Sequence, residues 1–181
     1  MRYVVAIDVG IKNLGMCVFD FMTAKFVFWD NISLVHNGRY LPSNNVQYVR
    51  EFVEKYKHFF EESLSVLVES QMRGNMRIIE AVLHTMFFEK CKIVNPKCIK
   101  AHYGIGTRNY RQNKQRAVEW VASFVSNNAS TFAPGVSSAF DQQLKKDDLA
   151  DSLLLVTYYL DTYSNQLEDE LVFVIDESVE G

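Results

Sequence analysis

The stretch VVAIDVGIKNLGMCVFD, residues 4–20, decides how the rest of the sequence is interpreted. Two runs rich in β-branched and other apolar residues flank a short segment with glycine, which predicts two buried strands joined by a tight turn. The first run ends in a carboxylate, Asp8, where apolar packing would otherwise continue. A buried charge is costly unless it is paired or bound to a metal ion. Asp8 is therefore either a structural cap on the turn or a ligand for a cation.

Beyond this stretch, the hydrophobic pattern predicts an α/β fold with a mixed sheet. Short apolar runs predict strands at 3–8, 13–20, 25–30, 65–70 and 91–95. Apolar residues at helical spacing predict helices at 44–62, at 73–90, from about 112, and at about 145–162. Three consecutive strands followed by alternating helices and strands are typical of a sheet that combines antiparallel and parallel pairs.

The composition is that of an ordinary globular protein. The chain of 181 residues is 48% apolar and 23% charged, and we expect a single domain over 1–181 with an acidic tail from about residue 165. Three cysteines, an odd number without metal-ligand spacing, indicate a reducing compartment and neither a disulfide framework nor a zinc site. No apolar run approaches the length of a membrane span, so we expect a cytosolic or nuclear protein.

The charge is distributed unevenly along the chain. The net charge is −3, but residues 1–140 hold 17 basic and 11 acidic residues, whereas residues 141–181 hold 2 and 11. Residues 90–116, called the basic segment below, contain eight Lys and Arg residues and no acid. Such a segment can neutralise nucleic-acid phosphates in spite of the negative total. The alternative is an ordinary solvated loop.

Further carboxylates occur at positions that a fold could bring to Asp8. Glu69 ends the apolar run SVLVES, and KKDDLADSLLLV places Asp148 and Asp151 near the start of a predicted helix. Residues three apart share a helix face, with their Cβ atoms about 5–6 Å apart. The neighbouring Asp147 points elsewhere and is expected to be a helix cap or a solvated charge.

Carboxylates gathered on one face repel one another unless they bind a cation. Oxygen ligands without His or Cys partners select hard ions such as Mg²⁺ or Mn²⁺, and four carboxylates can hold two such ions about 3.5–4 Å apart. Each acid also has a structural explanation: Asp8 could cap the turn, Glu69 could pair with Arg73, and the DxxD pair could be solvated. The order strand-Asp, strand-Glu, helix-DxxD favours the metal site over these coincidences.

With these motifs in view, residues 3–160 resemble the RuvC-like Holliday junction resolvases of the ribonuclease H and retroviral-integrase superfamily. The resemblance rests on IDVGIKNLG, VLVES, the stretch NPKCIKAHYGIGTRNYRQNKQRAVEWV and DDLADSLLL. Asn13 and the segment ESQMRGNMR are similar to the poxvirus members in particular. The resemblance implies a ribonuclease H-like fold, with a five-stranded mixed sheet of three antiparallel and then two parallel strands, flanked by helices.

The resemblance also implies an activity. Members are homodimeric, Mg²⁺-dependent endonucleases that bind a four-way DNA junction and nick two strands symmetrically, leaving 5′-phosphate and 3′-hydroxyl ends. Mn²⁺ may replace Mg²⁺, and no small-molecule cofactor or membrane is implied. For a poxvirus member, the expected role is to resolve concatemeric replication intermediates in the cytoplasm of the infected cell. The apolar helix at 73–90 is the surface that we expect to pair in the dimer.

Carried over to this sequence, the resemblance assigns roles to particular residues. The metal-binding and catalytic tetrad is Asp8, Glu69, Asp148 and Asp151. Lys114 is the expected catalytic lysine, with Lys100 as its rival, because a lysine there could steady the scissile phosphate. The expected DNA contacts are Lys12, Asn13, Lys100, Arg108 and Arg111.

Three other functions fit part of the pattern. A ribonuclease H would cut RNA–DNA hybrids and would be monomeric. A noncatalytic nucleic-acid-binding module of the same fold should have lost at least one carboxylate of the tetrad, and all four are present. A sugar-kinase-like or actin-like ATPase shares the DxG turn but needs a second phosphate loop and a longer chain.

Overall fold

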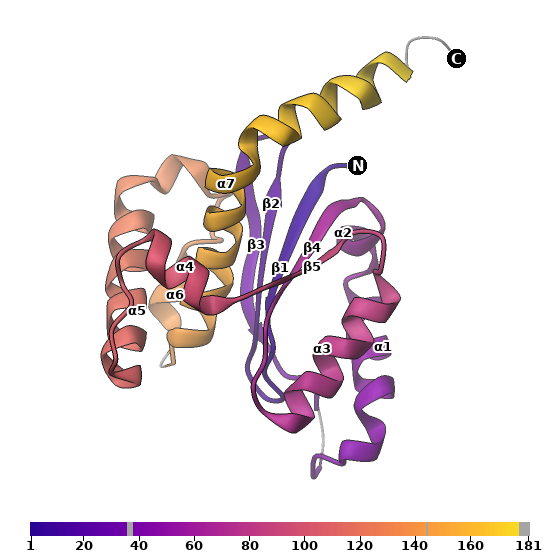
Figure 1. Ribbon diagram of the computed structural model, residues 1–181, viewed down its shortest axis with the longest axis vertical. Coiled ribbons are helices and arrows are strands. Elements are labelled where there is room, and N and C mark those ends of the chain that lie inside the picture. The colour runs from indigo at the N-terminus through magenta and orange to yellow at the C-terminus, as the bar shows by residue number, and fades with distance from the viewer. Residues whose placement is uncertain (36–37, 144, 178–181) are drawn as a thin grey trace.

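The computed structural model describes residues 1–35, 38–143 and 145–177, with side chains described as far as Tyr163. A central sheet lies between two layers of helices (Figure 1). The strands are β1 (Tyr3–Asp8), β2 (Leu14–Asp20), β3 (Lys25–Ile32), β4 (Ser63–Glu69) and β5 (Cys91–Val94). All five lie close to the predicted ranges, because each is a short apolar run bounded by polar residues or by glycine.

The sheet is mixed, with the strand order β3-β2-β1-β4-β5. The β1–β2 and β2–β3 pairs are antiparallel, and the β1–β4 and β4–β5 pairs are parallel. This arrangement confirms the predicted five-stranded sheet of three antiparallel and then two parallel strands. It also puts β1 at the centre, so that the ends of β1 and β4 lie side by side.

One face of the sheet is covered by α1 (Asn45–Lys55), α2 (Lys57–Glu61) and α3 (Gly74–Met86), with a short 3-10 turn at Pro42–Asn44 before them. The predicted helix 44–62 is therefore two helices, because Tyr56 leaves helical geometry at φ −110° and ψ 23°. Phe59 and Phe60 of α2 can then pack beneath the sheet with the residues of this side of the core. The helix predicted at 73–90 ends earlier, at Met86.

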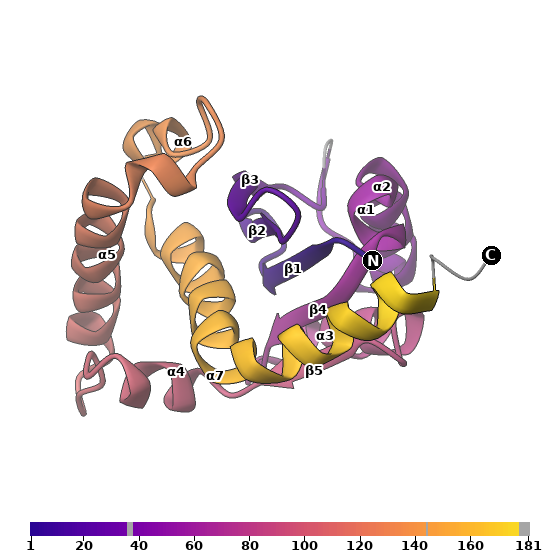
Figure 2. The same ribbon diagram turned by 90° about the horizontal axis from the view of Figure 1, so that it is seen from above.

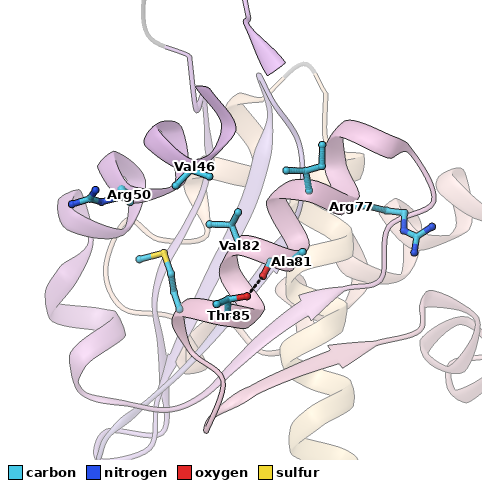
Figure 3. Close-up of a pocket in the computed structure, with 8 residues that line it drawn as sticks. Val46, Arg50, Arg77, Ala81, Val82 and Thr85 are labelled. Carbon is cyan, nitrogen blue, oxygen red and sulfur yellow. Dashed lines mark hydrogen bonds between the residues drawn. The ribbon is translucent and has the colours of Figure 1, made fainter. Parts of the chain in front are cut away.

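The surface of this layer carries an apolar groove between α1 and α3 (Figure 3). We call it the α1–α3 groove; it has a volume of about 730 Å³. Apolar side chains that line it remain accessible to solvent, with exposed fractions of 52% for Val46, 46% for Ile78 and 42% for Met86. Arg50 and Arg77 also line the groove.

The opposite face is covered by α4 (Pro96–His102), α5 (Tyr110–Asn127), α6 (Ser138–Gln142) and α7 (Asp147–Glu177), with a 3-10 turn at Ala129–Thr131. Of these, α7 lies against the sheet and α5 packs outside it (Figure 2). The core on this side is built from leucines of α7, including Leu149, Leu153 and Leu155, packed on alternate residues of the strands.

Two short helices of this layer were not predicted. Pro96 follows the predicted strand 91–95 and occupies the first turn of α4, and the side chain of Asn95 caps that helix by accepting from Lys97 N at 2.9 Å. Asn-Pro is a helix-start signal as much as a strand-stop signal. The second, α6, lies between the helices predicted from about 112 and at about 145–162, and Phe140 of α6 stacks on Trp29 at 5.1 Å between ring centroids.

The last helix is longer than predicted. Its expected end at about 162 was wrong, because the α7 backbone continues to Glu177. No proline or glycine interrupts residues 147–177, so the sequence offers no helix breaker there. Within the part of the chain that the structure describes, no helix combines the length and the apolar character needed to cross a membrane.

Candidate active site

Strand alternation directs two of the predicted carboxylates to the same face of the sheet. Successive side chains of a strand point to opposite faces. In β1, Val4 and Ala6 pack in the core on the α7 side, so Asp8 follows them onto that face. In β4, Leu67 packs on the same side, and Glu69 follows it. Because β1 and β4 are parallel neighbours, both carboxylates emerge at the same edge.

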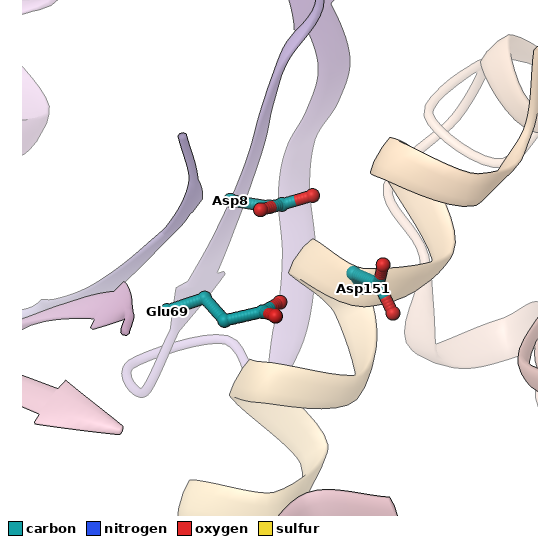
Figure 4. Close-up of side chains that lie close together, drawn as sticks. All are labelled: Asp8, Glu69 and Asp151. Atoms are coloured by element: carbon teal, nitrogen blue, oxygen red, sulfur yellow. The ribbon is translucent and has the colours of Figure 1, made fainter. Parts of the chain in front are cut away.

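The third carboxylate comes from the helix that covers this edge. Asp151 lies on α7 and faces Asp8 and Glu69 (Figure 4). One oxygen from each of the three carboxylates lies within 4.8 Å of the other two. All three residues are half-buried, so they remain accessible from solvent while most of their surroundings are protein.

A glycine in β2 allows α7 to pack closely against the sheet beside the carboxylates. Gly15 of β2 pairs directly with Asp8 in the sheet. A Cβ atom on Gly15 would lie 2.1 Å from the backbone oxygen of Asp148, so any side chain there would push α7 away. Trp29 of β3 fixes the same turn of the helix, because its Nε1 donates a buried hydrogen bond of 3.0 Å to the backbone oxygen of Leu149. The sheet therefore determines where α7 begins.

The electrostatics of the cluster favour a bound cation. Burial, and then the charge of Asp151, raises the pKa of Asp8 to about 8. Burial, and then the charge of Asp8, raises the pKa of Glu69 well above its ordinary range. Burial also raises the pKa of Asp151, to about 6, although the positive charges of Lys100 and Lys114 oppose this. Three carboxylates that resist simultaneous ionisation form a donor set that fits a hard divalent ion.

Asp148, the fourth predicted ligand, lies near this group but outside it. Its charge contributes to the raised pKa of Asp8, so the two side chains interact. However, its carboxylate forms an ion pair with Lys145, whose Nζ donates to Asp148 Oδ2 at 2.5 Å. The structure thus brings together three carboxylates of the predicted tetrad and holds the fourth against a lysine.

Lys114, the expected catalytic lysine, lies in the first turns of α5 and forms an ion pair with Asp147. Although partial burial acts in the opposite direction, the hydrogen bond from Lys114 to Asp147 raises the pKa of the lysine above its ordinary value. Asp147 is not a solvated charge, because its side chain is only 15% exposed and is paired; it does lie in the first turn of α7, where a helix cap was the other expectation. Periodicity could not reveal this contact, since it joins two helices that are remote in sequence.

The expected DNA contacts occupy two places. Lys12 and Asn13 lie exposed in the β1–β2 turn, directly after Asp8. Arg108 is exposed in the loop before α5, and Arg111 is exposed in the first turn of that helix, on the face that it shares with Lys114 three residues later. These positions leave the side chains free to reach a ligand.

Lys100 differs from these exposed residues, because it is half-buried on α4. Its charge lowers the pKa of both Glu69 and Asp151, so it lies near the carboxylates. The charge of Lys114 acts on the same two groups and also on Asp8. Both lysines considered from the sequence therefore lie beside the cluster.

Three residues of the site had not been singled out in the sequence. Gly15 could have been noticed, because a glycine inside an apolar strand often marks a close approach of another backbone. Gln71 donates to Asp8 Oδ1 at 3.3 Å and to the backbone oxygen of Glu69 at 3.1 Å. Lys145 forms the ion pair with Asp148 described above. Gln71 and Lys145 lie within quoted segments, ESQMRGNMR and KKDDLADSLLLV, but nothing in those segments marks either residue as a contact of a carboxylate.

Three solved structures of Holliday junction resolvases are similar to this chain. The yeast mitochondrial Holliday junction resolvase Ydc2 matches with a TM-score of 0.66 and 17% identity, over 92% of this chain and 85% of that one. The fowlpox virus resolvase in complex with Holliday junction DNA matches with a TM-score of 0.65 and 16% identity, over 88% and 97%. T. thermophilus RuvC in complex with its Holliday junction substrate matches with a TM-score of 0.52 and 14% identity, over 89% and 96%.

These identities are low, so the structural matches establish the fold, which is the ribonuclease H-like fold expected from the sequence. No curated protein sequence matches the chain. The family model described as Poxvirus A22 protein matches residues 2–162, which is most of the chain and includes every carboxylate of the site. The resemblance to poxvirus proteins noted in the sequence is thereby confirmed, and the chain belongs to the poxvirus A22 protein family.

Proposed function

We propose that this protein is a structure-selective endonuclease that resolves four-way DNA junctions by paired, symmetric nicks. The observation that carries the proposal is the convergence of Asp8, Glu69 and Asp151, from two strands and a helix, within 4.8 Å. The family match and the fold shared with the fowlpox virus resolvase and with RuvC, both of which were solved with Holliday junction DNA, support the choice of substrate.

The carboxylates suit two Mg²⁺ ions, for which Mn²⁺ can substitute. When bound, these ions would supply an activated water and stabilise the leaving oxygen of an in-line displacement. Asp8, Glu69 and Asp151 would hold them, and Asp148 would complete the tetrad on release from Lys145. Cleavage then leaves 5′-phosphate and 3′-hydroxyl ends.

The basic residues beside the cluster would hold the DNA backbone. Lys114 is the first candidate for steadying the scissile phosphate, and Lys100 is the second, because both charges act on the carboxylates. Arg108 and Arg111, and separately Lys12 with Asn13, would contact phosphates farther from the cut. Contacts of this kind position the DNA without reading its bases, which suits an enzyme that recognises junction shape.

Paired nicks require two active sites, and a symmetric homodimer supplies them. The α1–α3 groove supports α3 as the pairing surface, because it exposes Val46, Ile78 and Met86 in a continuous apolar area. Analytical ultracentrifugation should show a dimer, and Ile78→Asp should shift it to a monomer. A monomeric wild-type protein at micromolar concentration would contradict this part of the proposal.

Membership of a poxvirus protein family supports a viral setting for this activity. Acting as a single nuclease domain, the protein would resolve concatemeric viral replication intermediates into unit genomes in the cytoplasm of the infected cell. The four-way junction is the branched structure that such intermediates would present to it.

The test compares three substrates. Purified protein is incubated with a synthetic four-way junction, a linear duplex and an RNA–DNA hybrid, each with Mg²⁺ and with EDTA. We expect paired nicks in the junction alone and only with Mg²⁺; cleavage of the hybrid alone would assign the protein to the ribonuclease H class instead. Asp151→Asn should bind the junction without cutting it, whereas Asp141→Asn, at a side chain that is 83% exposed, should cut normally.

A further inference from the structure

The short loop after β4 is tied to the carboxylate cluster through Gln71. The side-chain nitrogen of Gln71 donates to Asp8 Oδ1 at 3.3 Å and to the backbone oxygen of Glu69 at 3.1 Å. The same amide group thus contacts residues from both strands that supply carboxylates. Gln71 is half-buried, whereas the next residue, Met72, is 94% exposed, so the loop turns its glutamine inward.

The orientation of this amide is fixed by chemistry. A glutamine NH₂ group has two hydrogens, and its carbonyl oxygen has none. Both neighbours of the Gln71 nitrogen, a carboxylate oxygen and a backbone oxygen, are acceptors. Turning the amide over would set an oxygen against two oxygens, so the donor orientation is the only one that forms both bonds. Oδ2 of Asp8 is not used by Gln71 and remains free for another partner.

The backbone of the loop is held from two sides. Gln71 N donates to Glu80 Oε2 at 2.6 Å, a hydrogen bond to a charged acceptor from the second turn of α3. Ser70 N donates to the backbone oxygen of Val94 in β5 at 2.9 Å. Hydrogen bonds to α3 and β5 therefore fix the backbone of the loop at Gln71. The side chain of Gln71 donates to Asp8 from this fixed backbone position.

We propose that Gln71 is a positioning residue that holds Asp8 in the orientation needed to bind the metal ion, and that Glu80 acts through it by fixing its backbone. This inference rests on the proposed function and adds two residues to the site. A neutral donor suits the role, because it orients the carboxylate without cancelling the charge that attracts a cation. Groups of this kind, which orient metal ligands, commonly change metal affinity about 10–100-fold when they are removed.

The experiment measures metal binding without DNA and without cleavage. Mn²⁺ binding to the full-length protein is followed by isothermal titration calorimetry for the wild type, Gln71→Leu, Glu80→Ala and the double variant. Gln47→Leu is the matched control, because Gln47 is an exposed glutamine on α1 that bonds Glu51 at 2.8 Å, in the opposite helix layer from α7. Junction affinity in EDTA is measured in parallel by fluorescence anisotropy.

We expect Gln71→Leu to bind Mn²⁺ about 10-fold more weakly or worse, with junction affinity unchanged. Glu80→Ala should weaken Mn²⁺ binding in the same direction, and the double variant should be no worse than Gln71→Leu, because both act through one hydrogen bond to Asp8. A Gln71→Leu variant that binds Mn²⁺ with wild-type affinity would overturn the proposal. If the losses of Mn²⁺ affinity in Gln71→Leu and Glu80→Ala add fully in the double variant, Glu80 does not act through Gln71. If Gln71→Leu does not fold, Glu80→Ala carries the same test.

The two levels of inference fail in different ways. A wild-type protein that binds no Mn²⁺ and cuts no junction would reject the proposed function, and the role of Gln71 with it. A wild-type protein that binds Mn²⁺ and cuts junctions, beside a Gln71→Leu variant with unchanged Mn²⁺ affinity, would reject the role of Gln71 alone.

Discussion

Replacing Asp8 by asparagine should make the metal-free protein more stable while removing the proposed metal site. One oxygen from each carboxylate lies within 4.8 Å of the others, and two unit charges at that limiting distance repel by about 3.5 kcal/mol at an effective dielectric constant of about 20. Solvent access and the charge of Lys114 reduce this repulsion. We therefore expect the free energy of unfolding of Asp8→Asn to be about 2 kcal/mol higher than that of the wild type at pH 8 in EDTA. For a chain of this length, this corresponds to a rise in Tm of about 4–8 °C.

The pH dependence of this gain has a definite sign. The pKa of Asp8 is raised from 3.8 to about 8 in the folded protein, so the folded state holds a proton that the unfolded chain releases. The stability of the metal-free wild type must then fall as the pH rises from about 4 to about 8, and the asparagine variant lacks this contribution. The two proteins should have similar Tm values at pH 4 and diverge above it.

The assay is thermal denaturation followed by circular dichroism, in EDTA and then in Mg²⁺. Mg²⁺ should raise the Tm of the wild type at pH 8 and leave that of Asp8→Asn unchanged, because binding to the folded state alone stabilises it. Asp141→Asn is the control for loss of one exposed negative charge and should match the wild type in both buffers. An Asp8→Asn variant that melts at or below the wild-type temperature at pH 8 in EDTA would refute the electrostatic argument.

Three further substitutions test other parts of the structure. Gly15→Ala should destabilise the protein by about 1–3 kcal/mol and reduce the Mg²⁺-induced rise in Tm, since the new methyl group meets the α7 backbone; Gly74→Ala, with open space around it, is the control. Trp29→Phe should cost about 1–3 kcal/mol in urea denaturation, because a buried carbonyl of α7 loses its donor. Arg108→Gln should weaken junction binding and reduce the slope of log affinity against log salt by about one, whereas Lys55→Gln on the opposite helix layer should not; an unchanged slope for Arg108→Gln would exclude it from the DNA contacts.

The parts of the fold that depend on short segments of sequence could be predicted. The strands are short apolar runs with polar ends, and the order of elements implied a mixed sheet, which the structure confirms. Several helix boundaries could not be predicted, because they depend on single residues that are compatible with more than one local structure. Pro96 can end a strand or start a helix, and Tyr56 interrupts a continuous helical pattern for reasons that the pattern does not contain.

In the candidate site, too, some residues could be predicted from the sequence and others could not. The carboxylates could be identified because each one stands at the end of an apolar element or on a marked helix face. The roles of Asp147, Gln71 and Gly15 could not, because each is defined by an atom of another element: a lysine on α5, a carboxylate on β1 and a backbone oxygen of α7. Local sequence predicts what a side chain can do, but the partner that makes use of it is set by the tertiary structure.

The carboxylates of the cluster are far apart in the sequence, at residues 8, 69 and 151. During synthesis, the first two can be in place before the helix that carries the third has left the ribosome. A nascent chain, or one that stops before Asp151, would therefore lack one of the three carboxylates. The proposed nuclease activity therefore requires synthesis of the chain at least as far as Asp151.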